Sequence, residues 1–280
     1  MHQKRSSHTK FKDRNSKALI VLVLICLSVF VLCLYKLLPK AEEYRQSAKA
    51  YRKIREEAVL TPAPPALDEI SAEAEKTPPS DAGIIDWEPL KGMDAVAWLM
   101  LDDISYPVLQ GDDNSEYLHA LPDHTYNYGG SIFLDTVNSS SFTDSNSIIY
   151  GHNMADGSMF GSFHSRYDSA GYRDHSFCLY LPDGTKHTYT FFSVLTTETG
   201  SSVYTCAFRN DQAFLNWQNM LKQSARYENS PRPDRNARFV SLSTCYGMAG
   251  TTRRLVIVGI ETGAETVQKP ASWYRNPPEC

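Results

Sequence analysis

An apolar stretch close to the N-terminus is the feature that most constrains how this chain can fold. Residues Ala18 to Tyr35 are apolar apart from Ser28. This length approaches the roughly 20 residues that a helix needs to cross the hydrocarbon core of a bilayer. A cleaved signal peptide is the competing interpretation, but the run from Leu34 to Leu37 offers no small-residue cleavage site. The sequence therefore predicts an uncleaved transmembrane anchor over residues 18–38.

The charges before this stretch predict its orientation. Residues 1–17 contain a single acidic side chain, Asp13, and a set of basic ones: Lys4, Arg5, Lys10, Lys12, Arg14 and Lys17. Basic flanks stay on the cytoplasmic side of a membrane. We therefore expect a single-pass protein of the cell membrane, with residues 1–17 in the cytoplasm and everything after the anchor outside. Cys26 and Cys33 fall inside the span, where they face lipid or pack.

Residues 39–83 have the composition of a stalk. Lys40 to Ala58 is rich in Ala, Glu, Lys and Arg and predicts a charged helix that continues from the membrane. Thr61 to Ser80 is rich in proline, alanine, glutamate and serine, which favours an extended spacer over a packed core. Disordered filler is the plainer interpretation of this spacer. Either way, we expect a globular domain held away from the membrane.

Residues 84–265 form the predicted globular part, of a size suited to one domain. Short apolar runs separated by turn residues predict strands and hence a β-barrel or β-sandwich. The runs are Ala97–Met100, Tyr106–Gln110, Ser131–Leu134, Ser147–Tyr150, Ser176–Leu181 and Lys186–Val194, the last two joined by a turn at Pro182–Thr185. Helices are predicted over Trp87–Val96, from Asp113 to Leu118, and over Asn210–Ser224, where Phe214, Trp217 and Leu221 share one face. Packing of that face on the sheet is favoured over binding to a partner.

Composition excludes several classes of function. The formal net charge of -4 comes without a basic patch interleaved with aromatic residues, so no nucleic-acid partner is expected. The sequence contains no CxxC pair of the kind that binds zinc. The Asp102-Asp103 pair lacks the spacing of oxygen ligands that a calcium loop requires. We therefore predict neither a metal nor a cofactor. Cys178 and Cys206 could pair as a disulfide outside the cell, an alternative that the sequence leaves open.

The apolar run that ends in Ser241-Leu242-Ser243-Thr244-Cys245 is the strongest candidate for a catalytic strand. Side chains alternate along a strand, so Cys245 points away from the face that carries Leu242. A cysteine at a strand end, before the loop that begins with Tyr246-Gly247, is well placed to meet a substrate. The plainer alternative is a buried cysteine that acts as a small hydrophobic residue.

Two further groups supply the chemistry that a thiol nucleophile needs. His152 follows the strand Ser147–Tyr150 and Gly151, and a histidine can take up and return a proton near neutral pH. Arg253 or Arg254 begins the aliphatic strand that ends at Ile260, where a guanidinium can stabilise an oxyanion. Taken singly, His152 is a solvated loop histidine and the arginines are charges that protect a strand edge.

These motifs together resemble the sortases, specifically class B. The resemblance rests on Leu242–Cys245, on Ile149–Met154 followed by Met159-Phe160-Gly161, and on arginine before an aliphatic strand; Tyr106–Gly111 and Gly130–Asp135 add to it. It covers about Asp86 to Ile260. The resemblance implies a mainly β fold with peripheral helices, an eight-stranded sortase-type barrel. A helical insert, expected at Asn210–Ser224, and the loop through Pro231 and Pro233 would help shape specificity.

The resemblance also implies an activity: a cysteine transpeptidase that anchors secreted proteins to the cell wall of a Gram-positive bacterium. Cys245 would attack a C-terminal sorting signal after threonine, giving a thioacyl intermediate. His152 would protonate the departing amine and deprotonate the incoming amine of a peptidoglycan cross-bridge or its lipid-linked precursor. Family sequences usually place the catalytic arginine directly before the aliphatic run, which favours Arg254 over Arg253. The expected substrate contacts are Ser243, Asn153, Thr244 and Arg253.

Two alternatives remain at this point. A pilus-polymerising sortase would use a pilin lysine, but Asp86-Trp87-Glu88-Pro89 does not fit the lid motif that such enzymes usually carry. A non-catalytic extracellular binding module would keep the same residues for structural reasons. Tyr246 stands where many relatives have an acidic or small polar residue, so the sorting motif, of the Asn-Pro-X-Thr type or a variant, stays open. The tail, residues 266–280 with Cys280, has no assigned role.

Overall fold

The computed structural model describes residues 6–60, 84–167, 175–224, 234–247 and 250–267. The predicted spacer Thr61–Ser80, the loop with Pro231 and Pro233, and Cys280 in the tail lie outside these residues. The chain divides into two compact units, Met1–Gln46 and Ser47–Cys280.

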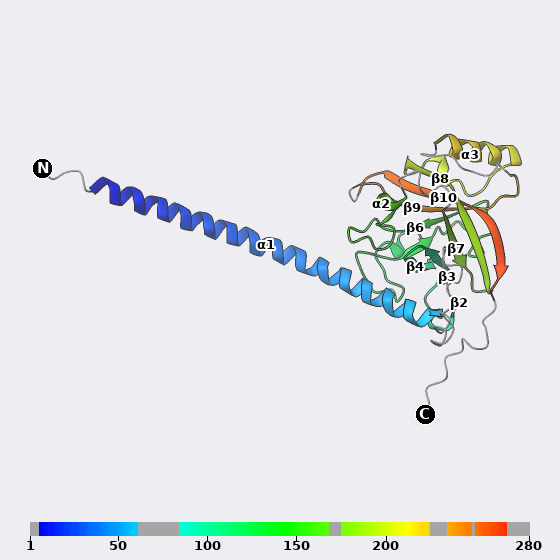
Figure 1. Cartoon of the computed structure of the whole chain (residues 1–280), viewed down its shortest axis with the longest axis horizontal. Helices are drawn as coiled ribbons and strands as arrows, with labels where there is room; N and C mark the ends of the chain where they lie inside the picture. Colours follow the sequence, from blue (N-terminus) through cyan, green and yellow to red (C-terminus); the bar gives the residue numbers. More distant parts are fainter. Residues whose placement is uncertain (1–5, 61–83, 168–174, 225–233, 248–249, 268–280) are drawn as a thin grey trace, which may run out of the picture. The chain divides into compact units, whose positions relative to one another are not determined.

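The first unit consists of the N-terminal part of helix α1, which runs over Ser6–Ala58 (Figure 1). An 18-residue window of this helix reaches a mean hydropathy of 2.8, and side chains such as Leu22 and Phe30 are more than half exposed. By length and composition, this helix is suited to cross a membrane. The predicted charged helix Lys40–Ala58 is confirmed as the continuation of the same helix.

The last turns of α1 belong to the second unit and pack on the barrel. Tyr51, Ile54 and Ala58 are buried, and the Tyr51 hydroxyl donates to the Gly130 carbonyl at 3.0 Å. Burial raises the pKa of Tyr51, so the phenol stays protonated as a hydrogen-bond donor. After α1, strand β1 (Val59–Leu60) pairs antiparallel with β2 (Ile84–Ile85). These contacts attach the end of the helix to the domain.

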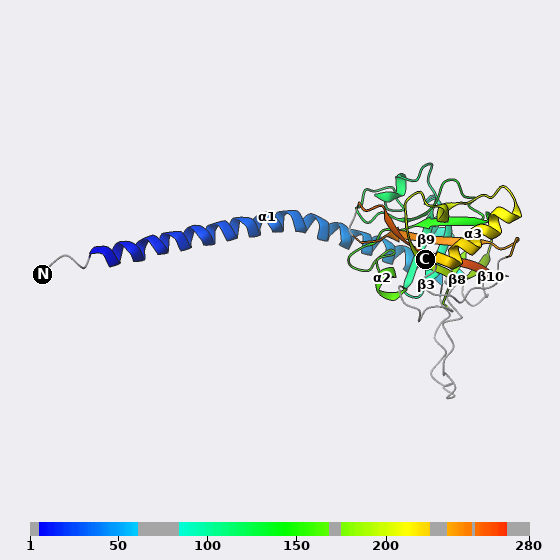
Figure 2. The same cartoon turned by 90° about the horizontal axis from the view of Figure 1, so that it is seen from above.

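The core of the second unit is a closed eight-stranded barrel, which confirms the predicted fold class (Figure 2). Its strands follow the order β10-β8-β7-β3-β4-β5-β6-β9, and β9 pairs with β10 to close the sheet. Only the pairs β4–β5 and β6–β9 are parallel. The bounds are β3 Ala95–Leu101, β4 Ile104–Leu109, β5 Ile132–Leu134, β6 Asn146–Tyr150, β7 Ser176–Tyr180, β8 Thr185–Glu198, β9 Phe239–Cys245 and β10 Arg253–Thr266.

Helix α3 (Asp211–Ser224) covers one side of the barrel beside β8 (Figure 1). As predicted, Phe214, Trp217 and Leu221 form its buried face, and they pack against residues of β8, β9 and β10. Asn210 caps the helix, since its side-chain oxygen accepts from the backbone N–H of Ala213 at 2.8 Å. Strand β9, which contributes Phe239 to this cluster, is buried on both faces from Phe239 to Thr244, so the strand that carries the candidate nucleophile is firmly held.

The prediction of a helix over Trp87–Val96 is wrong for most of this range. Only Glu88–Leu90 forms a single 3-10 turn, η1, and strand β3 already begins at Ala95. Gly92 has φ +81° and Asp94 has φ +45°, which no right-handed helix can contain. The apolar periodicity of this segment therefore reflects a turn followed by a strand.

The other predicted elements are confirmed within one to three residues, except that two strands are longer than expected: β8 continues past Val194 to Glu198, and β10 continues past Ile260 to Thr266. The predicted turn is present, with Gly184 at φ +86°. Asp113 accepts from the backbone N–H of Ser115 and Glu116 and so caps the 3-10 helix η2 (Glu116–Leu118). Helix α2 (Phe163–Arg166) and the 3-10 helix η4 (Ser202–Tyr204) were not predicted.

Candidate active site

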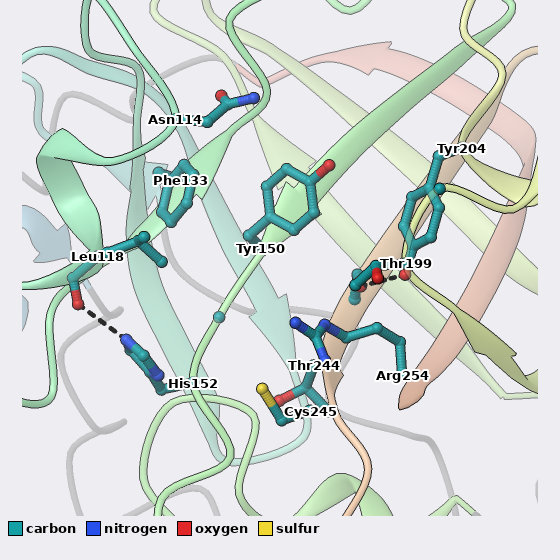
Figure 3. A pocket seen from close by; sticks show the side chains of 13 residues that line it. Asn114, Leu118, Phe133, Tyr150, His152, Thr199, Tyr204, Thr244, Cys245 and Arg254 are labelled. Carbon is teal, nitrogen blue, oxygen red and sulfur yellow. Dashed lines mark hydrogen bonds between the residues drawn. The ribbon is translucent and has the colours of Figure 1, made fainter. Parts of the chain in front are cut away.

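One cavity of about 420 Å³ opens where β6, β9 and β10 end (Figure 3). The ends of these strands lie together because β6 and β9 run parallel and β10 returns antiparallel beside β9. The lining residues are Asn114, Leu118, Phe133, Tyr150, Gly151, His152, Thr199, Gly200, Tyr204, Ser243, Thr244, Cys245 and Arg254. Five residues of the predicted site are thus brought together.

Cys245 is the last residue of β9, and its thiol lines the cavity. The thiol is half-buried, whereas the six residues before it in β9 are buried. Its backbone carbonyl accepts from Nε2 of His164, in α2, at 2.9 Å. Strand pairing on one side and this hydrogen bond on the other fix the position of the thiol.

Arg254 lies directly opposite Cys245 in the β9–β10 pair. Its guanidinium lines the cavity beside Cys245 (Figure 3), and its Nη1 donates to the carbonyl of Thr251 at 2.5 Å and of Arg253 at 3.0 Å. Arg253 is exposed and is not among the residues that line the cavity; its guanidinium lies over the ring of Tyr246, 4.7 Å from the centroid. The two adjacent arginines therefore have different surroundings.

His152 follows β6 and is held by one hydrogen bond, from Nε2 to the carbonyl of Leu118 at 2.8 Å (Figure 3). A carbonyl oxygen can only accept, so Nε2 carries the proton and Nδ1 is the free base of the neutral ring. Burial lowers the pKa of His152, and the nearby His119 lowers it further, while the Leu118 hydrogen bond opposes both effects. The neutral imidazole is therefore the favoured form.

Aromatic side chains form the wall of the cavity between these groups. The Tyr204 hydroxyl and the Ser243 hydroxyl are hydrogen-bonded at 2.9 Å, and the Tyr150 hydroxyl donates to the Asp135 carboxylate at 2.8 Å. Burial is the largest cause of the raised pKa of both phenols. The Thr244 hydroxyl is buried and has no hydrogen-bond partner among the described residues. The wall thus offers apolar surface with a few fixed hydroxyls.

Some site residues were not foreseen from the sequence. Asn114, Leu118, Thr199 and Tyr204 line the cavity from segments with no motif of their own. Conversely, Asn153, predicted as a substrate contact, is not among the lining residues; its backbone pairs with Met159. The contact between His152 and Leu118 spans 34 positions, so no local sequence signal reveals it.

One group of side chains in the described residues has the ligand types of a metal site. Asp94, Glu116 and His124 each place one such atom within 4.8 Å of the others. His124 already pairs with both carboxylates, at 3.7 Å from Asp94 and 3.3 Å from Glu116. Exposed acidic groups of this kind are common without an ion, so the group carries no metal assignment. Asp102 and Asp103 bind Tyr167, His175 and Arg166 instead.

The two cysteines that could have paired are both free thiols. Cys178 contacts the Thr188 hydroxyl, and Cys206 contacts Asn138 and the carbonyl of Tyr204. Burial raises the pKa of Cys206 to about 11 and also raises that of Cys178. Both thiols therefore stay protonated near neutral pH.

The chain is similar in sequence and in structure to known proteins. A model of the sortase domain matches residues 101–262. Sortase B of Listeria monocytogenes serovar 1/2a is 35% identical over 154 residues, which cover 54% of this chain and 63% of that protein. The crystal structure of Clostridium perfringens sortase B has a TM-score of 0.58 and 27% identity, covering 64% of this chain and 100% of the other. A Staphylococcus aureus sortase B–substrate complex has a TM-score of 0.57 and 28% identity, covering 63% and 84%.

A closed barrel that brings a thiol, an imidazole and a guanidinium to one cavity defines a protein equipped for cysteine-dependent acyl transfer. The matched sortase model spans more than half of the chain. The chain belongs to the sortase family, whose members are cysteine transpeptidases, and its structural neighbours are class B sortases. The matched region covers slightly less than two thirds of the Listeria relative.

Proposed function

We propose that this protein is a membrane-anchored cysteine transpeptidase of class B. In this proposal it cleaves a C-terminal sorting signal after threonine and transfers the secreted protein to a peptidoglycan amine. The observation that carries the proposal is the meeting of Cys245, His152 and Arg254 at one cavity. Each supplies one function that acyl transfer through a thiol requires: a nucleophile, a proton carrier and a cation for the oxyanion.

In the first half-reaction, the thiol proton of Cys245 passes to Nδ1 of His152, and the sulfur attacks the threonine carbonyl. A C–S bond forms, the C–N bond to the next residue breaks, and the leaving amine takes the proton from His152. The assignment of Nδ1 is supported by the hydrogen bond that commits Nε2 to the carbonyl of Leu118. The product is a thioester on Cys245.

Arg254 is proposed to stabilise the oxyanion of each tetrahedral intermediate. Its register position opposite Cys245 supports this role, and Arg253 lies over Tyr246 instead. Removing one oxyanion donor from an enzyme typically costs about 10²–10³ in rate. Ser243 and Thr244 are proposed substrate contacts, since both line the cavity. The roles proposed for Asn153 and Arg253 as substrate contacts have no such support.

In the second half-reaction, the amine of a cross-bridge or a lipid-linked precursor attacks the thioester. Its nitrogen gives one proton to Nδ1 of His152, a C–N bond forms, and the C–S bond breaks. His152 then returns the proton to the sulfur, so the enzyme regains its starting state. The preference of His152 for the neutral form suits it to accept this proton.

The anchor and its orientation are part of the proposal. Helix α1 has the length and hydropathy of a membrane span, and the basic residues before it favour a cytoplasmic N-terminus. The catalytic domain then works outside the cell, where secreted proteins and peptidoglycan precursors meet. A Staphylococcus aureus sortase B of the same fold has been solved as a substrate complex, which supports a substrate site in this barrel.

The test uses the full chain in detergent and a panel of peptides that end in Asn-Pro-X-Thr, Pro-Pro-X-Thr or Ser-Pro-X-Thr type signals. Mass spectrometry should find an acyl adduct on Cys245 with at least one peptide. The adduct should disappear in Cys245→Ala and persist in Cys206→Ser, a matched control for the other thiol near the cavity. Contrary evidence would be a folded protein that forms no adduct and whose Cys245 resists a small alkylating agent, the behaviour of a binding module.

A further inference from the structure

Two rings lie near-parallel to the ring of His152, the histidine of the cavity. The ring centroid of His119 is 5.7 Å from that of His152 and 6.1 Å from that of Tyr128, and the Tyr128 and His152 centroids are 6.4 Å apart. Interplanar angles of 19–20° make the three rings almost parallel. Tyr126 extends the group, with its centroid 6.1 Å from that of His119. We refer to His119, Tyr126 and Tyr128 as the aromatic surface.

The aromatic surface is accessible to solvent. Tyr126 is 70% exposed and Tyr128 is 36% exposed, and both are among the few large apolar side chains that the described part of the domain exposes. None of the three residues lines the cavity that holds Cys245. The surface therefore reaches His152 from a direction that differs from the cavity in which the acyl group would lie.

The loop that carries these rings has a fixed backbone. His119 accepts at its carbonyl from the N–H of Asn127 at 2.9 Å, and Ala120 pairs with Tyr126 as a short antiparallel bridge. Within the loop, Thr125 donates from its N–H and hydroxyl to the carboxylate of Asp123. A ligand would meet rings that are already in place, which reduces the entropy lost on binding.

The charge of this region favours a cationic ligand. The segment 111–130 contains four carboxylates, Asp112, Asp113, Glu116 and Asp123, and neither lysine nor arginine. The faces of aromatic rings also attract cations, by about 0.5–1 kcal/mol at exposed sites. On the other side of the cavity, Arg254 supplies a positive charge. The two sides thus differ in the ligands that they attract.

We propose that the aromatic surface binds the ammonium group of the acceptor and delivers the amine to His152. This proposal rests on the proposed transpeptidase function and names the site of its second substrate. The acceptor class is a peptide that presents a primary amine, bound first as the ammonium. The ammonium loses one proton to water, and the neutral amine then attacks the thioester and gives its second proton to Nδ1 of His152.

The test compares two acceptors with different charge, using the full chain and a donor peptide that acylates Cys245. Nα-acetyl-lysine methylamide carries an ammonium at neutral pH, whereas hydroxylamine is mostly uncharged. Tyr126→Leu and Tyr128→Leu remove the ring but keep an apolar side chain. We expect each to raise the half-saturating concentration of the lysine acceptor about two- to fivefold and to leave that of hydroxylamine essentially unchanged.

Two controls define the role of the rings. Tyr126→Phe keeps the ring and should restore most of the affinity for the lysine acceptor that Tyr126→Leu loses. Val137→Ala truncates an apolar side chain of similar exposure, 73%. Val137 belongs neither to the cavity lining nor to the aromatic surface, so this variant should leave the half-saturating concentration of both acceptors unchanged. Equal loss for both acceptors, or no loss for either, would overturn the proposal.

A measurement on the wild-type protein covers the case in which the leucine variants do not fold. Tetramethylammonium chloride, which cannot react, should compete with the lysine acceptor but not with hydroxylamine. Absence of competition against the lysine acceptor would also overturn the proposal. Failure of the proposed function has a different signature, because wild type would then form no thioester in the absence of any acceptor.

Discussion

The two sides of the cavity are built in different ways. On one side, Cys245 and Arg254 face each other across paired strands, β9 and β10, and are followed into the barrel by buried residues of both strands. On the other side, His152 follows the end of β6, and one hydrogen bond to the carbonyl of Leu118 holds its ring. The proposed nucleophile and oxyanion group thus depend on strand register, whereas the proposed proton carrier depends on a loop contact.

This difference indicates which parts of the site tolerate change. A register shift in β9 would move Cys245 to the other face, so many ladder hydrogen bonds oppose it. The position of the Leu118 carbonyl depends on fewer contacts than that of β9. Gly130 packs against this carbonyl, and the Tyr51 hydroxyl of α1 donates to the carbonyl of Gly130. We expect substitutions on the strand side to affect chemistry directly and those on the loop side to act through the orientation of His152.

The largest effect should come from the strand side. Arg254→Lys keeps the charge but loses the planar guanidinium, and we expect thioester formation to slow about 10²–10³-fold. Arg253→Lys is the matched control, because it loses only a contact with the Tyr246 ring and should stay within about threefold. Single-turnover rates of acylation measure both. The reverse order of effects would assign the oxyanion role to Arg253.

An intermediate effect should come from Gly130→Ala on the loop side. A Cβ at Gly130 would lie 2.3 Å from the Leu118 carbonyl oxygen, so this carbonyl must shift and His152 must turn with it. We expect acylation to slow by up to about 100-fold, as for other small misplacements of a catalytic group.

Gly184→Ala provides the control for the backbone strain. Like Gly130, Gly184 has a positive φ, of +86°. A Cβ added at Gly184 would have no atom within 4 Å, unlike one added at Gly130. This variant should lose about 1 kcal/mol of stability and keep its activity, measured by thermal unfolding and acylation rate. Equal activity loss in the two variants would show that strain, and not the Leu118 contact, causes the effect.

The smallest effect concerns the protonation of His152. Its pKa is lowered by burial and by His119, so the folded protein binds fewer protons than the unfolded chain as pH falls below about 6.5. The stability that comes from this group is therefore complete above that pH and decreases as pH falls toward the lowered pKa. His119→Ser removes the like charge and exposes the ring, so the pKa of His152 should rise.

An NMR titration of the His152 ring measures this shift. Its pKa in His119→Ser should lie above that of the wild type, so a smaller fraction of the ring should be neutral at pH 6. His124→Ser replaces another histidine of the same loop that does not contribute to the shift, and it should leave the titration unchanged. An unchanged or lower pKa in His119→Ser would contradict the account.

The sequence predicted the strand side of the site better than the loop side. Cys245 ends an apolar run and Arg254 stands just before the next, so the predicted strand ends bring both to one cavity, whereas the choice of Arg254 over Arg253 came from the family resemblance. Leu118 ends the short 3-10 helix η2 and His119 follows it, in a segment with no periodic pattern, and their contacts with His152 span more than 30 positions. The helix predicted over Trp87–Val96 failed for a similar reason: the sequence does not reveal that Asp94 has a positive φ, which a right-handed helix cannot contain.

The central claim of this account is that His152 transfers protons through Nδ1 because Leu118 occupies Nε2. Nitrogen NMR of the chain labelled at histidine, with His152→Gln to assign the signals, tests it most directly. The account predicts that the neutral ring carries its proton on Nε2 and that Nδ1 is unprotonated. A ring with its proton on Nδ1 would contradict it, since Nε2 could then not donate to the Leu118 carbonyl.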